Sequence, residues 1–290
     1  ATFNSTEKYY IYGNSQGFLA GYPTTRHALS CVMIAQDAQG MQRDYQYTIH
    51  RNPSLLKHAK IIGSEAAQRA LDRLSSQRVP TQTIPVIFRA DVATSLFSHF
   101  CSAIAGSKLY RKASFLLDSL NTQLFPKNLE ILEEPHLQQA LGSAPFDADG
   151  VQTRSRYLIK EGILQGYILS AYSARKLNMA NTGNAGGIHN LIVSHQDITL
   201  KDLIHSQKKA LFVTELMGQG INLVTGNYSR GAAGFMIEDG EIKYPVHEIT
   251  IAGNLKDMFK QMSAISNDVD RRGNIQTGSV LIESMMLAGS

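Results

Sequence analysis

The residues best suited to chemistry stand in the segment 86–106, which reads VIFRADVATSLFSHFCSAIAG. It carries Asp91 and His99, side-chain types that bind metal ions or move protons. Zinc needs three or four such groups, and sites within one segment usually read H-E-x-x-H or C-x-x-C, neither of which occurs here. Eight residues of helix are about two turns, too far for both side chains to bind one ion. We therefore interpret His99 as a histidine at the edge of the core.

Nucleophilic catalysis has no local signature in this chain. The elbow G-x-S-x-G is absent, and the two cysteines, Cys31 and Cys101, lie in apolar runs that disfavour the reactive thiolate. A catalytic triad assembled from distant positions remains open. Two buried thiols without a disulfide framework indicate a reducing compartment, so we expect a cytoplasmic protein.

Three glycine-rich stretches are the next candidates: GNAGG at 183–187, GQG at 218–220 and RGAAG at 230–234. Successive backbone amides can hold a phosphate, but these stretches match neither nucleotide-binding pattern. We expect instead a close approach of backbone, within the fold, between subunits, or to an extended peptide on a strand edge.

Polar side chains gather in and near these loops and could line a polar cavity that binds substrate; the alternative is that they are solvated loop residues. The candidates are Arg175, His189, Asn190, Glu215, Tyr228, Ser229 and Arg230. The basic pairs at 111–112 and 271–272 are interpreted as solvated faces.

The elements that must position these residues fall into two parts. Residues 1–76 predict an antiparallel meander, rich in Tyr, Val, Ile and Thr between turns such as 37–40, and then a helix capped by Ser64. A stretch with two prolines and no periodicity, 77–85, predicts a linker. Residues 86–290 form the second domain.

The second part begins with a short strand, PVIF at 85–88, and a helix over 91–105, with Asp91 as its N-cap and Gly106 as its stop. Turns at 161–162 and 239–240 predict hairpins, and the cap residues Thr199 and Asn254 predict helices, the second reaching Ile265. Strand clusters do not alternate with helices. The class is therefore α+β: a strand-rich N-terminal lobe followed by a larger mixed, mainly antiparallel sheet domain with flanking helices.

The composition of the chain argues against two classes of partner, nucleic acids and membranes. The 28 Lys and Arg against 24 Asp and Glu are spread along the chain, so we expect no nucleic acid partner. No apolar run approaches the ~18 residues of a transmembrane helix, so we expect no membrane span. The first residue is not Met, which indicates a processed or truncated start.

Longer strings carry a family resemblance. They are TELMGQGINLVTGNYSRGAAGFMIEDGEIKYPVHEITIAGNLKDMF at 214–259, YRKASFLLDSL at 110–120, SAYSARKL at 170–177 and GNAGGIHN at 183–190. With these strings the chain closely resembles the PmbA/TldE branch of the TldD/PmbA family (peptidase U62, "modulator of DNA gyrase"). The resemblance extends from YGNSQG at 12–17 to GSVLIESMMLAG at 278–289. Members usually carry a further amino-terminal region, so the chain resembles the later part of the first lobe with a complete second lobe.

The resemblance implies a cytoplasmic complex in which TldD and TldE pair around a cavity and cut extended or unfolded peptides, in peptide-antibiotic (microcin) maturation and antitoxin breakdown. TldD carries zinc on HExxxH, at the start of a helix after an apolar strand, and on a later Cys. The matching positions here hold Ala90, Asp91 in place of Glu, Ser95 and, near the late Cys, Thr277. A methyl group, hydroxyls and a shortened carboxylate cannot replace that set.

The resulting hypothesis is a metal-free subunit with no catalytic residue or cofactor of its own. Its expected partners are a TldD-like subunit, which holds the zinc, and a peptide or unfolded-protein substrate; a homodimer is possible when the chain is alone. The alternatives are an independently active homodimeric peptidase and a non-enzymatic binding protein that acts on a topoisomerase system.

Overall fold

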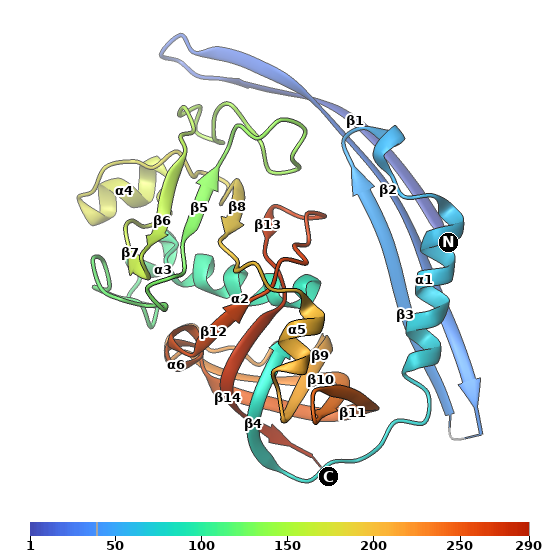
Figure 1. Ribbon diagram of the computed structural model, residues 1–290. Coiled ribbons are helices and arrows are strands. Elements are labelled where there is room, and N and C mark those ends of the chain that lie inside the picture. The colour runs from blue at the N-terminus through green and yellow to red at the C-terminus, as the bar shows by residue number, and fades with distance from the viewer. Residues whose placement is uncertain (39, 290) are drawn as a thin grey trace.

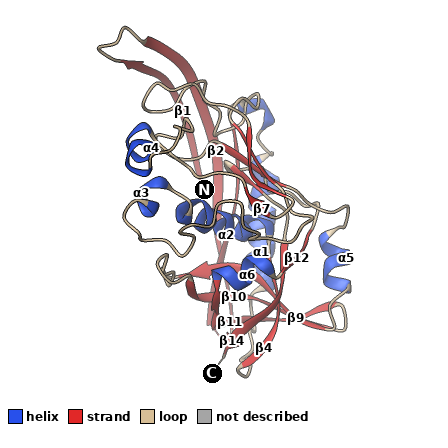
Figure 2. Ribbon diagram, turned by 90° about the vertical axis from the view of Figure 1, so that its left-hand side faces the viewer, coloured by secondary structure: helices blue, strands red, loops and turns tan. Residues whose placement is uncertain are grey.

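The computed structural model describes residues 1–38 and 40–289, which form three sheets and their covering helices (Figure 1). The first sheet is the expected antiparallel meander, in the order β1-β2-β3. Its strands are β1 (Thr2–Gly13), β2 (Leu19–Asp37) and β3 (Gly40–His50). The turn predicted at 37–40 includes residue 39, which lies outside the described residues. In both views the hairpin of β1 and β2 projects beyond the rest of the chain (Figures 1 and 2).

Helix α1 (Ala59–Asp72) packs on β2 and β3 through Ile62, Ala66 and Ala70, after a short 3-10 turn, η1 (Pro53–Leu55). The prediction that Ser64 caps this helix is wrong. The cap is His58, whose ring nitrogen accepts a hydrogen bond from the backbone N–H of Lys60, so the helix begins more than one and a half turns earlier than predicted.

The second sheet forms the lower half of the larger domain in Figure 1, in the order β11-β10-β9-β4-β14-β12. A further pairing between β11 and β14 closes five of its strands on themselves. The strands are β4 (Gln82–Phe88), β9 (Lys209–Met217), β10 (Asn227–Glu238), β11 (Glu241–Asn254), β12 (Met262–Ile265) and β14 (Val280–Ala288). The strand predicted at 85–88 begins three residues earlier, inside the segment expected as a linker.

The third sheet has the order β13-β8-β5-β6-β7. Its strands are β5 (Ile131–Glu134), β6 (Arg156–Lys160), β7 (Ile163–Leu164), β8 (Asn190–Val193) and β13 (Ile275–Gln276). The hairpins predicted at 161–162 and 239–240 are confirmed, because β6 pairs with β7 and β10 with β11 across those turns. Helices α3 (Gly106–Leu109) and α4 (Ala171–Leu177) flank this half. The α+β class is confirmed.

Helix α2 (Ala90–Ala103) lies between the second and third sheets and fills the main core (Figure 1). Its apolar face, which includes Leu96, Phe97 and Phe100, is fully buried. Two details of the prediction are wrong. The N-cap is Arg89, which leaves Asp91 in the first turn, and the helix ends at Ala103, before α3 begins at residue 106.

The outer face of the second sheet carries a smaller core, formed with α5 (Leu200–His205), which Thr199 caps as expected. Asn254 also caps a helix, α6 (Leu255–Lys260), but this helix is shorter than predicted. The residues that follow, up to Ile265, form β12, because they pair with β14. Within the described residues no helix is long and apolar enough to cross a membrane.

Candidate functional site

The positions that the family resemblance predicts to correspond to the zinc ligands of TldD lie at the start of α2 and in the loop before β14. Ala90 donates its backbone N–H to Ser279 Oγ over 3.0 Å. The Ser95 hydroxyl donates to the carbonyl of Val92 over 2.8 Å, and the fully buried Thr277 hydroxyl donates to the carbonyl of Gly278. A methyl group and two hydroxyls bonded to backbone do not fit a zinc ion. Across residues 1–38 and 40–289, no cluster of three His, Cys, Asp or Glu side chains could hold a metal.

Asp91 is held by arginines from three separate elements. Arg89 contacts both of its carboxylate oxygens, at 2.7 and 3.0 Å. Arg272, from the loop before β13, and Arg69, from α1, approach one oxygen at 3.5 and 3.9 Å. The Asp91 side chain is only 14% exposed. Its lone pairs are therefore taken up by protein cations.

The same arginines set the acidity of this carboxyl group. Burial alone would raise the pKa of Asp91, but the charge and hydrogen bonds of Arg89, with the more distant charges of Arg69 and Arg272, hold it below its ordinary value. Asp91 therefore stays ionised near neutral pH, and through Arg69 it links helix α1 to the larger domain.

The edge of β3 that faces Asp91 is already hydrogen-bonded from Arg43 to Tyr47. The carbonyls of Arg43, Tyr45 and Tyr47 accept hydrogen bonds from guanidinium groups at 3.1, 3.3 and 3.3 Å. The respective donors are Arg73, Arg69 and Arg272. The N–H groups of Tyr45 and Tyr47 donate to the preceding side chains, Asp44 and Gln46. A peptide could pair with this edge only by displacing the arginines.

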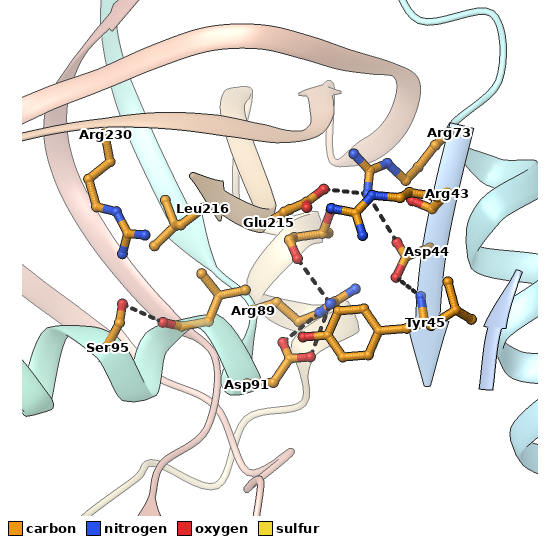
Figure 3. A pocket seen from close by; sticks show the side chains of 13 residues that line it. Arg43, Asp44, Tyr45, Arg73, Arg89, Asp91, Ser95, Glu215, Leu216 and Arg230 are labelled. Atoms are coloured by element: carbon orange, nitrogen blue, oxygen red, sulfur yellow. Dashed lines mark hydrogen bonds and ion pairs between the residues drawn. The ribbon is translucent and has the colours of Figure 1, made fainter. Parts of the chain in front are cut away.

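Beside that edge a cleft of about 270 Å³ opens between β3 and α2 (Figure 3). Its polar lining includes four arginines and three carboxylates, and its apolar lining includes Val32, Val92 and Leu216. The charged residues are Arg43, Arg73, Arg89, Arg230, Asp44, Asp91 and Glu215.

The charges in the cleft are unequally paired. Arg73 contacts Glu215 at 2.5 Å and Asp44 at 3.4 Å, and so joins α1, β3 and β9. Arg43 and Arg230, by contrast, form no ion pair within the described part of the chain. Within the described residues the Arg230 side chain makes a single long hydrogen bond, 3.5 Å from Nε to the carbonyl of Met217. Figure 3 shows Arg230 pointing toward Leu216 and Ser95.

Of the seven loop residues predicted to line a cavity, the cleft brings together only Glu215 and Arg230. His189 and Asn190 are buried elsewhere: His189 donates its backbone N–H to Glu133, and Asn190 bonds to the backbone of residues 134 and 142. Burial alone would raise the pKa of Glu133, but hydrogen bonds from His189 and the charge of Arg156 lower it. This cluster fixes the loop 183–190.

The remaining three predicted residues lie away from the lining of the cleft. Arg175 is exposed on α4 and Ser229 is exposed on β10. Tyr228 is buried, with its hydroxyl unpaired, and its ring lies 6.3 Å from that of His99, whose Nε2 is also unpaired. Burial, together with the charge of Arg230, lowers the pKa of His99, in agreement with a histidine at the edge of the core.

The prediction that 271–272 is a solvated face is wrong for Arg272. Its guanidinium lies 4.3 Å above the ring centre of Tyr47 and is bonded to both oxygens of Asp270. The prediction of a buried Cys31 is also wrong: Cys101 is buried in α2, but Cys31 is partly exposed on β2, because no element covers that stretch of the strand fully.

Each glycine stretch contains a glycine that approaches backbone closely, as expected, although Gly187 and Gly218 have open space beside them. A methyl group on Gly220 would lie 1.7 Å from the carbonyl oxygen of Ser229, and one on Gly234 would lie 1.9 Å from that of Phe212. The close approach at Gly234 coincides with a β-bulge, where the register between β9 and β10 shifts between Ala233 and Gly234. These glycines are thus explained within the fold.

Family models match almost the whole chain. Residues 81–289 match the PmbA/TldA metallopeptidase C-terminal domain, and residues 2–74 match the central domain. The chain belongs to the PmbA/TldD family. Relatives named metalloprotease PmbA or its homologue are 51% identical in Escherichia coli O157:H7 and 48% identical in Haemophilus influenzae. A TldD homologue of Haemophilus influenzae is 24% identical over 72% of the chain, so the chain lies in the PmbA branch.

Solved structures agree with this assignment. A Bacteroides thetaiotaomicron protein described as a candidate modulator of DNA gyrase has a TM-score of 0.94 at 29% identity, over 99% of this chain and 65% of its own. TldE from Thermococcus kodakarensis has the same fold, with a TM-score of 0.87 at 22% identity over 99% of this chain and 68% of its own. The chain matches 99% to 100% of its own length to the two PmbA relatives, but spans only 64% of theirs.

Proposed function

We propose that this chain is the metal-free subunit of a zinc-dependent peptidase complex that processes or degrades extended peptides in the cytoplasm. The observation that carries the proposal is the start of α2. The family resemblance places Ala90 and Ser95 at the expected positions of the TldD histidines. The acid between them, Asp91, is engaged by three arginines. The metalloprotease name of the relatives then reflects zinc held by a TldD-like partner.

The division of labour follows from the chemistry. A bound zinc ion supplies an activated water and polarises the peptide carbonyl. This chain supplies a wall of the cavity in which the peptide lies, and the cleft between β3 and α2 is the part of that wall with uncommitted polar groups. Peptide-antibiotic maturation and antitoxin breakdown are the proposed tasks of the whole complex.

Pairing with a second subunit is supported by the first sheet. It exposes large apolar side chains along all three strands, with Leu19 at 76% and Ile34 at 70% the most exposed. The others are Phe3, Tyr9, Tyr10, Ile11, Val32, Met33, Met41 and Tyr45. Large apolar side chains exposed in this number are typical of a surface that binds another protein. We propose that it meets the TldD-like partner, or a second copy when the partner is missing.

Strand addition, expected from the sequence as a way of holding peptide, needs a strand edge with free backbone groups. The β3 edge beside the cleft does not offer one. The outer edge of β1 does, because β1 is the terminal strand of its sheet and 11 of its 12 residues are exposed. Any strand addition to the first sheet is therefore assigned to β1.

Reconstitution tests the proposal. Cleavage of an unfolded protein such as reduced casein is followed with this chain alone, with a TldD-like partner alone, and with both, each with and without a chelator. The expected result is robust cleavage only by the mixture, abolished by the chelator. Cleavage by this chain alone that persists with the chelator would establish the independent peptidase instead. If the mixture is inactive, the remaining alternative is that the chain is a non-enzymatic binding protein.

A further inference from the structure

The cleft beside β3 has a surplus of positive charge that the protein itself does not neutralise. Four arginines line it against three carboxylates, and two of the arginines, Arg43 and Arg230, have no acidic partner in the described part of the chain. A guanidinium that is partly removed from water, as Arg230 is, favours an anionic partner.

The shape of the cleft limits what that anion can be attached to. The volume of about 270 Å³ is slightly below the range of roughly 300–1,000 Å³ of pockets that hold small molecules. Val32, Val92 and Leu216 line the cleft beside the arginines, so it combines an apolar wall with a charged one. A chain end or one side chain of a peptide fits this description, and a folded domain does not.

The backbone of the cleft is not available for recognition. Guanidinium groups already occupy three carbonyls of the β3 edge, and the intervening N–H groups of Tyr45 and Tyr47 are bonded to side chains. A ligand must therefore be recognised by the side chains that remain uncommitted. Those include the guanidinium groups of Arg43 and Arg230, whose planar fork matches a carboxylate, and the buried hydroxyl of Thr214, which has no hydrogen-bond partner within the described residues.

We propose that this cleft binds a carboxylate group of an extended peptide, with Arg230 and Arg43 as its ligands. The group is either the C-terminal carboxylate or the side chain of an acidic residue, since both present the same two oxygens. This inference rests on the proposed function in one respect, that the chain meets peptides. It requires neither zinc nor the partner.

Fluorescence anisotropy with labelled octapeptides tests it on the purified chain at low salt. The two peptides of the first pair differ only at the C-terminus, which is a free acid in one and an amide in the other. Both peptides of the second pair carry a C-terminal amide, and they differ only in an internal Glu or Gln. Loss of the critical carboxylate is expected to weaken binding at least about tenfold. The pair that responds identifies the source of the carboxylate.

Variants locate the effect. Arg230→Gln is expected to remove the discrimination within the responding pair, whereas Arg230→Lys, which keeps the charge, retains part of it. Arg154→Gln is the matched control, because Arg154 is exposed and does not line the cleft. The acid–amide comparison on the unmodified chain does not depend on how any variant folds.

Three results would overturn the inference: no binding of any peptide, equal binding within both pairs, or full discrimination by Arg230→Gln. These failures are separable from failure of the proposed function. Stoichiometric zinc in this chain, or chelator-resistant cleavage by it, would refute the proposed function but leave carboxylate binding in place. Peptide binding that does not depend on a carboxylate would refute the carboxylate site but leave the proposed function in place.

Discussion

Replacement of Asp91 by Asn tests whether this carboxylate is the electrostatic link between the two parts of the chain. The change keeps the shape of the side chain but removes the charge that Arg89, Arg69 and Arg272 share. One partner removed from a fully buried pair costs about 3–5 kcal/mol, and an exposed pair contributes about 0–1 kcal/mol. The carboxylate is 14% exposed and its partners 18–25%, so we expect a loss of about 2–3 kcal/mol in the free energy of unfolding.

Urea unfolding followed by circular dichroism measures this loss, since the chain has no Trp for fluorescence. With a slope of about 3 kcal/mol per molar urea, the midpoint should fall by roughly 0.7–1 M. Glu7→Gln is the control: it also removes one negative charge, from an exposed residue of β1, and should change stability by less than about 0.5 kcal/mol. If Asp91→Asn is no more destabilising than this control, the electrostatic link is refuted.

The pH dependence supplies a second check on the same residue. Because the pKa of Asp91 is lower in the folded chain than in the unfolded chain, its contribution is fully present above the unfolded value, about pH 4. The contribution is lost as pH falls through the lower, folded pKa. The stability difference between the unmodified chain and Asp91→Asn should therefore be constant near neutrality and shrink below about pH 4. A difference that stays constant to pH 2 would contradict the ionised pair.

Three further predictions follow from other parts of the structure. Gly234→Ala should destabilise by about 2–4 kcal/mol in urea unfolding, because the added methyl group meets the carbonyl of Phe212, whereas Gly63→Ala, with open space in α1, should stabilise by about 0.5–1 kcal/mol. A thiol reagent should modify the partly exposed Cys31 quickly and Cys101 only after unfolding, since burial raises the pKa of the Cys101 thiol; two fast thiols in the native chain would refute this. Arg230→Gln should raise the pKa of His99, measured by NMR titration of its ring, because one of the two causes that lower it is removed; an unchanged pKa would place Arg230 too far away to act.

Local signals were sufficient where the cause of the structure is local. The Asp-Gly turn at 239–240 and the caps at Thr199 and Asn254 depend on residues within one turn, and the sequence predicts all three. The end of α6 was missed because its cause is distant: the pairing of β12 with β14 overrides a helical pattern.

The candidate site was less predictable for the same reason. Asp91 and Arg272 are 181 residues apart, and nothing in the sequence around Arg272 indicates that it contacts this aspartate. Glu215 and Arg230 were found because they adjoin the glycine stretches, but Arg43 and Arg73 come from the first lobe, which offered no motif. The altered zinc positions at the start of α2 stay a prediction from the family resemblance. The structure adds that Arg69, Arg89 and Arg272 contact Asp91, the acid between them.

The zinc content of the purified chain tests the central claim most directly. The chain is produced without a histidine tag in zinc-supplemented medium, dialysed, and measured by inductively coupled plasma mass spectrometry beside a TldD-like partner prepared in the same way. We expect less than about 0.1 zinc ion per copy of this chain and close to one per partner, because Ala90, Ser95 and Thr277 supply no zinc ligand. One tightly held zinc ion per copy of this chain would contradict it.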